Sequence, residues 1–168
     1  MLFGVWTPND SFAHNGCWPH ASDWDHMKSW KKSIVIHAPA NEVFAYVDDP
    51  MALPVWIPSL VEVRNVIGSG EGQQEEWTYK LAGLLLRGQA IVVEHVPNQR
   101  AVHQTIGMGH GNVGYAVEPH ADGATLTLEI DYEIPIPVLG KLAEHIAIQR
   151  NSREFESALV NVKETLEG

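Results

Sequence analysis

The chain has 168 residues, of which 45% are hydrophobic and 19% charged, and its formal net charge is −10. This length fits one domain and is enough to bury a core without a disulfide or a metal. The negative charge argues against nucleic acid and anionic membrane as partners, because both bind clustered lysine and arginine. A single cysteine, Cys17, excludes an internal disulfide and indicates a reducing compartment.

No segment approaches the roughly 20 consecutive apolar residues of a membrane-spanning helix. The first residues also lack the basic and apolar regions of a signal peptide. We therefore expect a cytoplasmic protein without stable membrane insertion.

Residues 1–26 differ in composition from the rest of the chain. They hold no lysine or arginine, and they carry four side chains of metal-ligand type: His14, Cys17, His20 and His26. Imidazole and thiolate suit zinc and other soft metals, but this spacing matches no zinc module. We interpret the segment as an aromatic-rich extension and expect no cofactor. The sequence leaves open whether the extension packs on the domain or whether Met27 is the start that the cell uses.

From residue 33 onward the sequence predicts a clear succession of strands and helices. β-branched residues predict a strand at 33–37, and Pro39 and Glu42 suit the first turn of a helix that Pro50 ends. A shorter helix is expected within residues 51–57. Turn residues then separate six predicted strands, at 60–67, 75–82, 85–96, 101–106, 112–118 and 124–134.

The last strand and the last helix show the strongest periodicity. Alternate residues of 124–134 share one apolar face: Leu126, Leu128, Ile130, Tyr132 and Ile134. Residues 140–167 predict a long helix whose apolar stripe is Ile148, Ser152, Phe155, Leu159, Val162 and Leu166. Its opposite side, which includes Glu154 and Lys163, is expected to be solvated. This pattern predicts an α+β fold with an antiparallel sheet wrapped on one helix.

The order of elements resembles that of a known superfamily. The segments that carry the resemblance are Ile36-His37-Ala38-Pro39, Trp56-Ile57-Pro58, Tyr132-Glu133-Ile134-Pro135 and Leu139-Gly140-Lys141-Leu142. They are similar to the START/Bet v 1-like (SRPBCC) superfamily, in its polyketide cyclase/dehydrase and lipid-transport branch. The resemblance implies a helix-grip fold: a curved antiparallel sheet of about seven strands on a long C-terminal helix, with two short helices after the first strand. It assigns residues 27–168 to one domain.

The resemblance also implies an apolar cavity between sheet and helix that binds a lipid, quinone, polyketide or similar small molecule. The ligand-binding candidates are Trp56, Trp77, Tyr79, Gln104, Tyr115, Tyr132, Ser152 and Phe155. Strand alternation is expected to point Gln104 inward beside Val102 and His103 outward; Arg87 and His95 are further polar candidates. The alternative is a filled core without a useful cavity.

Two other functions stay open at this point. A polyketide cyclase/dehydratase-type enzyme would use the same cavity, with His145 and Tyr79 as candidates for proton transfer. A START-like accessory subunit would act through a protein partner. A Gly-x-Gly-x-x-Gly match at Gly109, Gly111 and Gly114 lies between two predicted strands, whereas a dinucleotide site needs a helix after it, so we interpret it as a turn.

Overall fold

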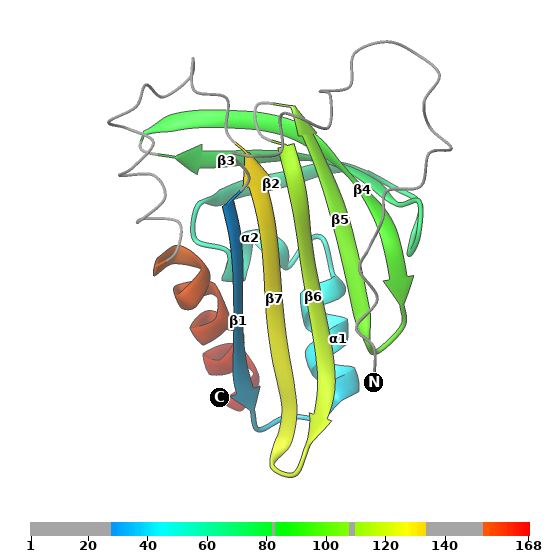
Figure 1. Cartoon of the computed structure of the whole chain (residues 1–168), viewed down its shortest axis with the longest axis vertical. Coiled ribbons are helices and arrows are strands. Elements are labelled where there is room, and N and C mark those ends of the chain that lie inside the picture. The colour runs from blue at the N-terminus through cyan, green and yellow to red at the C-terminus, as the bar shows by residue number, and fades with distance from the viewer. Residues whose placement is uncertain (1–27, 82, 108–109, 134–152) are drawn as a thin grey trace.

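The computed structural model describes residues 28–81, 83–107, 110–133 and 153–168. It contains a seven-stranded antiparallel sheet with the strand order β1-β7-β6-β5-β4-β3-β2 (Figure 1). Its elements are β1 (Lys28–Ile36), α1 (Ala40–Asp48), α2 (Leu53–Trp56), β2 (Leu60–Ile67), β3 (Gln74–Leu81), β4 (Leu84–Val96), β5 (Arg100–Gly107), β6 (His110–His120), β7 (Gly123–Glu133) and a C-terminal helix described over residues 153–167.

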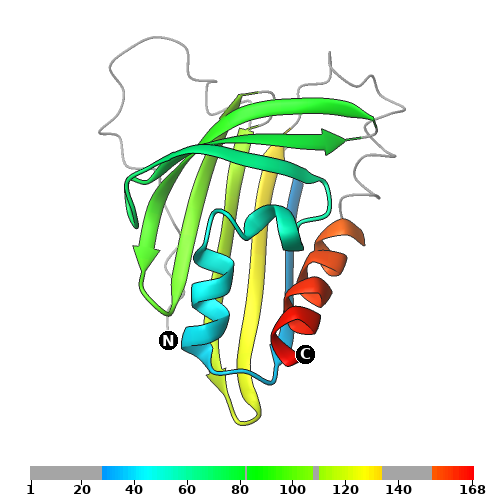
Figure 2. The same cartoon turned by 180° about the vertical axis from the view of Figure 1, so that it is seen from behind.

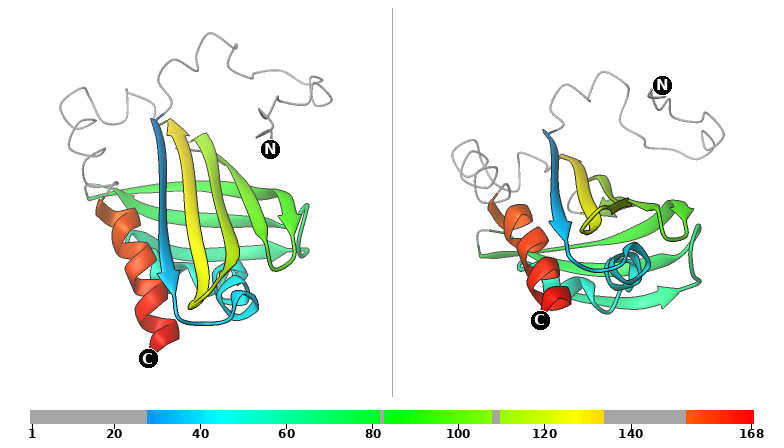
Figure 3. Two further views of the ribbon diagram at one scale, coloured as in Figure 1. Left: turned by 60° about the horizontal axis from the view of Figure 1, so that its bottom comes forward. Right: turned by 90° about the horizontal axis from the view of Figure 1, so that it is seen from below.

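The predicted helix-grip fold is confirmed. The sheet is strongly curved, and α1, α2 and the C-terminal helix lie on its concave side (Figures 2 and 3). Register shifts in β2 and β4, one of them between Val92 and Glu94, mark bulges of the kind that bend a strand. None of the described helices is long and apolar enough to cross a membrane.

The main core fills the end of the molecule between α1, the C-terminal helix and the middle of the sheet. Leu126 and Leu128 of β7 are fully buried, as their alternation predicts. The predicted stripe of the C-terminal helix is confirmed at Phe155, Leu159 and Val162, which are all buried. These side chains hold the helix against the concave side of the sheet.

The expectation of a solvated far side of this helix is wrong for two residues. Glu154 accepts a hydrogen bond from the Ser59 backbone nitrogen at 2.8 Å, and the Lys163 ammonium donates to the Val35 carbonyl at 2.6 Å. Both side chains satisfy backbone groups at the ends of neighbouring elements, which a helical projection of the sequence does not reveal. They fix the helix to β1 and to the loop after α2.

The last turn of the helix holds a pH-sensitive ion pair. The Glu167 carboxylate accepts from the Lys163 ammonium at 2.8 Å and from the His37 backbone nitrogen at 2.8 Å. The hydrogen bond from Lys163, followed by that from His37, holds the pKa of Glu167 below its usual range. Because the folded pKa is depressed, the stabilisation is present above the unfolded pKa and is lost as the pH falls through the folded pKa.

Replacing the Glu167 carboxylate is expected to remove this contribution to the loss of stability at acidic pH. Glu167→Gln lowers the melting temperature modestly at neutral pH, and the gap to the wild type narrows as the pH falls below the ordinary glutamate range. Thermal melts of both proteins across this range measure the effect. Glu164→Gln, on the exposed side of the same turn, is the control; an equal pH dependence in the two variants would contradict the assignment.

Candidate functional site

The concave face of the sheet forms what we call the inner wall, which consists of the inward-facing residues of β3 to β7. Strand partners that lie directly opposite each other point to the same side. One row across the inner wall is Glu75, Ala90, Thr105, Gly111 and Tyr132. Small residues therefore occupy the middle of this row, with a carboxylate at one end and an aromatic ring at the other.

The Trp77 ring reaches across to β4 beside this row. It pairs with Gly88, where a Cβ atom would stand 2.3 Å from the Trp77 ring and 2.3 Å from the Ile106 carbonyl oxygen. The indole nitrogen donates to the Gln89 carbonyl at 3.1 Å. A glycine at position 88 is thus required for the ring to approach β4.

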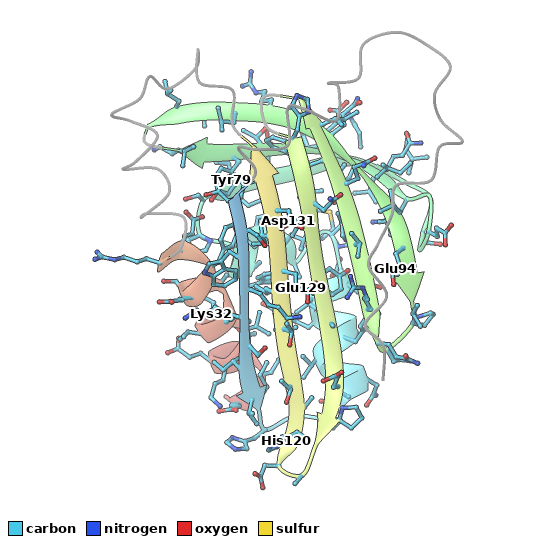
Figure 4. The ribbon with its side chains drawn as sticks, in the orientation of Figure 1. Lys32, Tyr79, Glu94, His120, Glu129 and Asp131 are labelled. Carbon is cyan, nitrogen blue, oxygen red and sulfur yellow. The ribbon has the colours of Figure 1, made fainter. Side chains whose placement is uncertain are left out.

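The end of the inner wall beyond Trp77 is apolar. Leu81 and Leu86 are buried there, with Trp77 and Tyr79 packed against them. The Tyr79 hydroxyl interacts with Glu154 and Ser59; burial, and next the Glu154 carboxylate, raise the pKa of Tyr79 far above its ordinary value. Tyr79 therefore stays protonated. It lies at the opposite end of the molecule from the β6–β7 hairpin that carries His120 (Figure 4).

The other side of the inner wall carries a continuous hydrogen-bonded set, which we call the polar chain: His95, Asp48, Tyr115, His103 and Glu75. The Tyr115 hydroxyl donates to Asp48 at 2.6 Å, and His95 Nε2 lies 3.0 Å from the same carboxylate. His103 Nε2 lies 3.4 Å from the Tyr115 oxygen, and His103 Nδ1 lies 3.3 Å from Glu75. The Gln73 amide donates to Glu75 at 3.2 Å.

Donor and acceptor roles in the polar chain follow from Tyr115. Burial, and next the hydrogen bond to Asp48, raise the pKa of Tyr115 far above its ordinary value, so its proton stays directed at Asp48. The Tyr115 oxygen keeps a lone pair toward His103 Nε2, and the other ring nitrogen of His103 lies next to the Glu75 carboxylate.

Removing the Tyr115 hydroxyl is expected to destabilise the fold. Tyr115 is 3% exposed, so Tyr115→Phe leaves the buried His103 and the half-buried Asp48 each short of a hydrogen bond and costs about 1–3 kcal/mol. Urea denaturation measures the loss. The control is Tyr46→Phe in α1, because the Tyr46 hydroxyl is buried and has no hydrogen-bond partner among the described residues. An equal loss in both variants would show that the polar chain contributes nothing.

The predicted orientation of β5 is wrong. His103 is 8% exposed and faces inward with Ala101, whereas Gln104 lies opposite Asn112 on the outer side of the sheet. The sequence favoured Val102 and Ile106 as the buried face because they are the larger apolar residues. Ala101 instead packs against Tyr115, and the polar chain satisfies the inward histidine. Arg87 is exposed and pairs with Thr78, on the face away from the inner wall.

The remaining candidates lie in different surroundings. Tyr115 and His95 belong to the polar chain, while Trp56 and Phe155 are buried, Trp56 in the main core. His145, Ser152 and the four N-terminal candidates His14, Cys17, His20 and His26 lie outside the described residues. Within the described ranges no three His, Cys, Asp or Glu side chains are placed to hold a metal ion.

Sequence reasoning did not single out Asp48 or Glu75. Glu75 shares its strand alternation with Trp77 and Tyr79, so the period of two alone would have placed it on the inner wall. Asp48 closes α1 and reaches the wall only because the helix packs on β6. No local signal reveals that contact.

A pocket of about 270 Å³ lies across β2 to β5, and most of its lining residues face the outer side of the sheet. Gln89, Ile106 and Glu76 are among its lining residues, and Asn65 donates to Glu76 at 2.9 Å. Glu75 and Ala90 of the inner wall also line this pocket, and Gln104 pairs with its lining residue Ile91. A substitution of Gln104 therefore changes the surface on the outer side of the sheet and leaves the inner wall as it is.

Comparison with known proteins gives a family and several similar folds. Residues 27–167 match the family described as polyketide cyclase/dehydrase and lipid transport. The Zhui aromatase/cyclase from Streptomyces sp. R1128 superposes with a TM-score of 0.69 at 15% identity, covering 84% of this chain and 94% of that one. TTHA0849 from Thermus thermophilus gives 0.70 at 19% identity, covering 83% and 96%. No curated protein sequence matches significantly.

Proposed function

Because the chain belongs to the polyketide cyclase/dehydrase and lipid-transport family, we propose that it binds a hydrophobic small molecule of polyketide, quinone or lipid type against the inner wall. The observation that carries the proposal is the arrangement of that wall. Small residues in the middle are bordered by aromatic rings on two sides and by the polar chain on a third. Apolar walls with a few fixed polar groups are typical of small-molecule sites.

The arrangement favours a ligand with an apolar body and at least one oxygen. The body would lie along Trp77, Tyr79 and Tyr132, where burial contributes about 25 cal/mol per Å² of apolar surface. The oxygen would lie toward His103 and Glu75, because Glu75 is two residues before Trp77 on the same face of β3. The similarity to the Zhui protein, an aromatase/cyclase, supports the polyketide class in particular.

The geometry supports binding more strongly than turnover. The hydroxyl groups of Tyr79 and Tyr115 are held by Glu154 and Asp48, and burial keeps both protonated. Such groups are suited to orient a ligand, whereas proton transfer requires a group whose pKa lies near the working pH.

Titration of the full chain with Nile red, a neutral hydrophobic fluorophore, tests the proposal. We expect a saturable rise in emission that is reversed by menadione, a quinone, or by oleate. Competition by one and not by the other identifies the ligand class. No saturable binding of the dye, or binding that neither competitor displaces, would contradict the proposal.

A further inference from the structure

The tip of the β3–β4 hairpin is apolar and exposed. Leu84 and Leu85 are adjacent in sequence and are 46% and 48% exposed. Strand alternation points them to opposite sides of the hairpin, so that both faces of the tip are apolar. Gly83 makes the turn with φ +89°, and a Cβ atom there would meet nothing within 4 Å. Among the described residues, none therefore packs against the turn at Gly83.

Two cations flank this apolar tip. Lys80 and Arg87 are exposed, and neither forms an ion pair with another described residue. From residue 77 to residue 93 the chain has no acidic residue, although its net charge is −10. The local charge of the hairpin is therefore opposite to that of the whole molecule.

The other described turns lack this combination. Ile67 is exposed before the β2–β3 turn, but Glu71 lies in that turn. The β6–β7 turn carries Asp122, and Met51, exposed before α2, follows Asp49. Exposed leucines next to unpaired cations occur only at the β3–β4 hairpin among the described segments.

We propose that the β3–β4 hairpin docks the protein on the surface of an anionic phospholipid bilayer. Leu84 and Leu85 enter the boundary between headgroups and acyl chains, while Lys80 and Arg87 contact the lipid phosphates. Screening confines the relevant charges to those within about 10 Å of the surface. Two carboxylates near the base of the hairpin already accept hydrogen bonds: Glu62 from Thr78, which pairs with Arg87, and Glu154 from the Ser59 nitrogen. This docking is peripheral and does not depend on a bound ligand in the interior.

The location of the hairpin gives the docking a consequence for the inner wall. Leu84 pairs with Leu81, and Leu81 belongs to the apolar cluster that contains Trp77 and Tyr79. A docked hairpin places the apolar end of the inner wall next to the bilayer, and the polar chain farther away. This orientation suits exchange of a hydrophobic molecule with the lipid phase.

Vesicle flotation of the full chain tests the proposal. We expect the protein to float with phosphatidylcholine vesicles that contain about one third phosphatidylglycerol, to float poorly with phosphatidylcholine alone, and to dissociate as salt is added. Lys80→Gln and Arg87→Gln each weaken partitioning about fivefold. The double variant L84S/L85S weakens it at least about tenfold.

Matched variants elsewhere on the surface distinguish docking through the hairpin from nonspecific adsorption to vesicles. Met51→Ser and Arg64→Gln remove an exposed apolar side chain and an exposed cation at other sites, and they are expected to float like the wild type. Absence of flotation with anionic vesicles would overturn the proposal. So would an equal loss in the hairpin and control variants. Near-ultraviolet circular dichroism checks that each variant is folded.

A fluorescent label gives a second readout. Leu85→Cys in a Cys17→Ser background, labelled with a nitrobenzoxadiazole dye, is expected to shift its emission to the blue on anionic vesicles. Val93→Cys, which is exposed farther along β4, is expected not to shift. No shift at position 85, or the same shift at both positions, overturns the proposal. Nile red binding in solution is unaffected by Lys80→Gln and Arg87→Gln, whose side chains lie on the face away from the inner wall, so failure of docking and failure of ligand binding are distinguishable.

Discussion

Thr105→Trp is expected to weaken Nile red binding by about 100-fold or more. Thr105 lies in the middle of the inner wall, between Ala90 on β4 and Gly111 on β6. An indole at this position occupies the space in front of the small residues where the ligand body is proposed to lie. The dye titration that defines wild-type binding measures the loss.

Gln104→Trp is the matched control for this experiment. It introduces the same side chain one residue earlier, on the outer side of the sheet, and is expected to leave Nile red affinity within about twofold of the wild type. The opposite result, loss in Gln104→Trp and none in Thr105→Trp, would place the dye in the outer pocket. Urea denaturation of both variants checks that the added volume does not unfold the protein.

Trp56→Ala is expected to lower the free energy of unfolding by about 3–5 kcal/mol. Trp56 is 1% exposed, and its side chain is the largest of the fully buried side chains among the described residues. Truncation leaves a cavity between α2 and the C-terminal helix, where Asn161 donates to the Trp56 carbonyl at 3.1 Å. Urea denaturation measures the loss, and Nile red affinity under folding conditions is expected to change little.

The neighbouring residue supplies the control. Val55 is 67% exposed on the same short helix, so Val55→Ala is expected to change the free energy of unfolding by less than about 0.5 kcal/mol. A loss below about 1.5 kcal/mol in Trp56→Ala, together with weaker dye binding, would contradict the core assignment. That result would instead support the sequence-based prediction that Trp56 contacts the ligand.

The elements that the sequence predicts well are those with local periodicity. Leu126 and Leu128 in β7, and Leu159 and Val162 in the C-terminal helix, repeat at the spacing of their element, and each is buried. The resemblance to a known superfamily then implied how these elements are arranged and that the sheet is curved. Neither step depends on a contact between residues far apart in the chain.

The polar chain depends on such contacts and was therefore not predicted. The hydrogen bond between Asp48 and Tyr115 joins residues 67 positions apart, and the contact between His103 and Glu75 joins β5 to β3 across β4. Burying a histidine is unfavourable without partners, so a sequence without those contacts favours an outward His103. The same reasoning pointed Gln104 inward, and the structure corrects both.

Native mass spectrometry of the full chain as purified, followed by organic extraction, tests the central claim most directly. The proposal predicts a discrete added mass in the wild type that extraction releases as a polyketide, quinone or lipid, and that is absent from Thr105→Trp. Nile red added to ligand-free protein is predicted to give a complex of one dye per chain. Bare chain alone in both samples, with and without the dye, would contradict the account of the inner wall as a binding site.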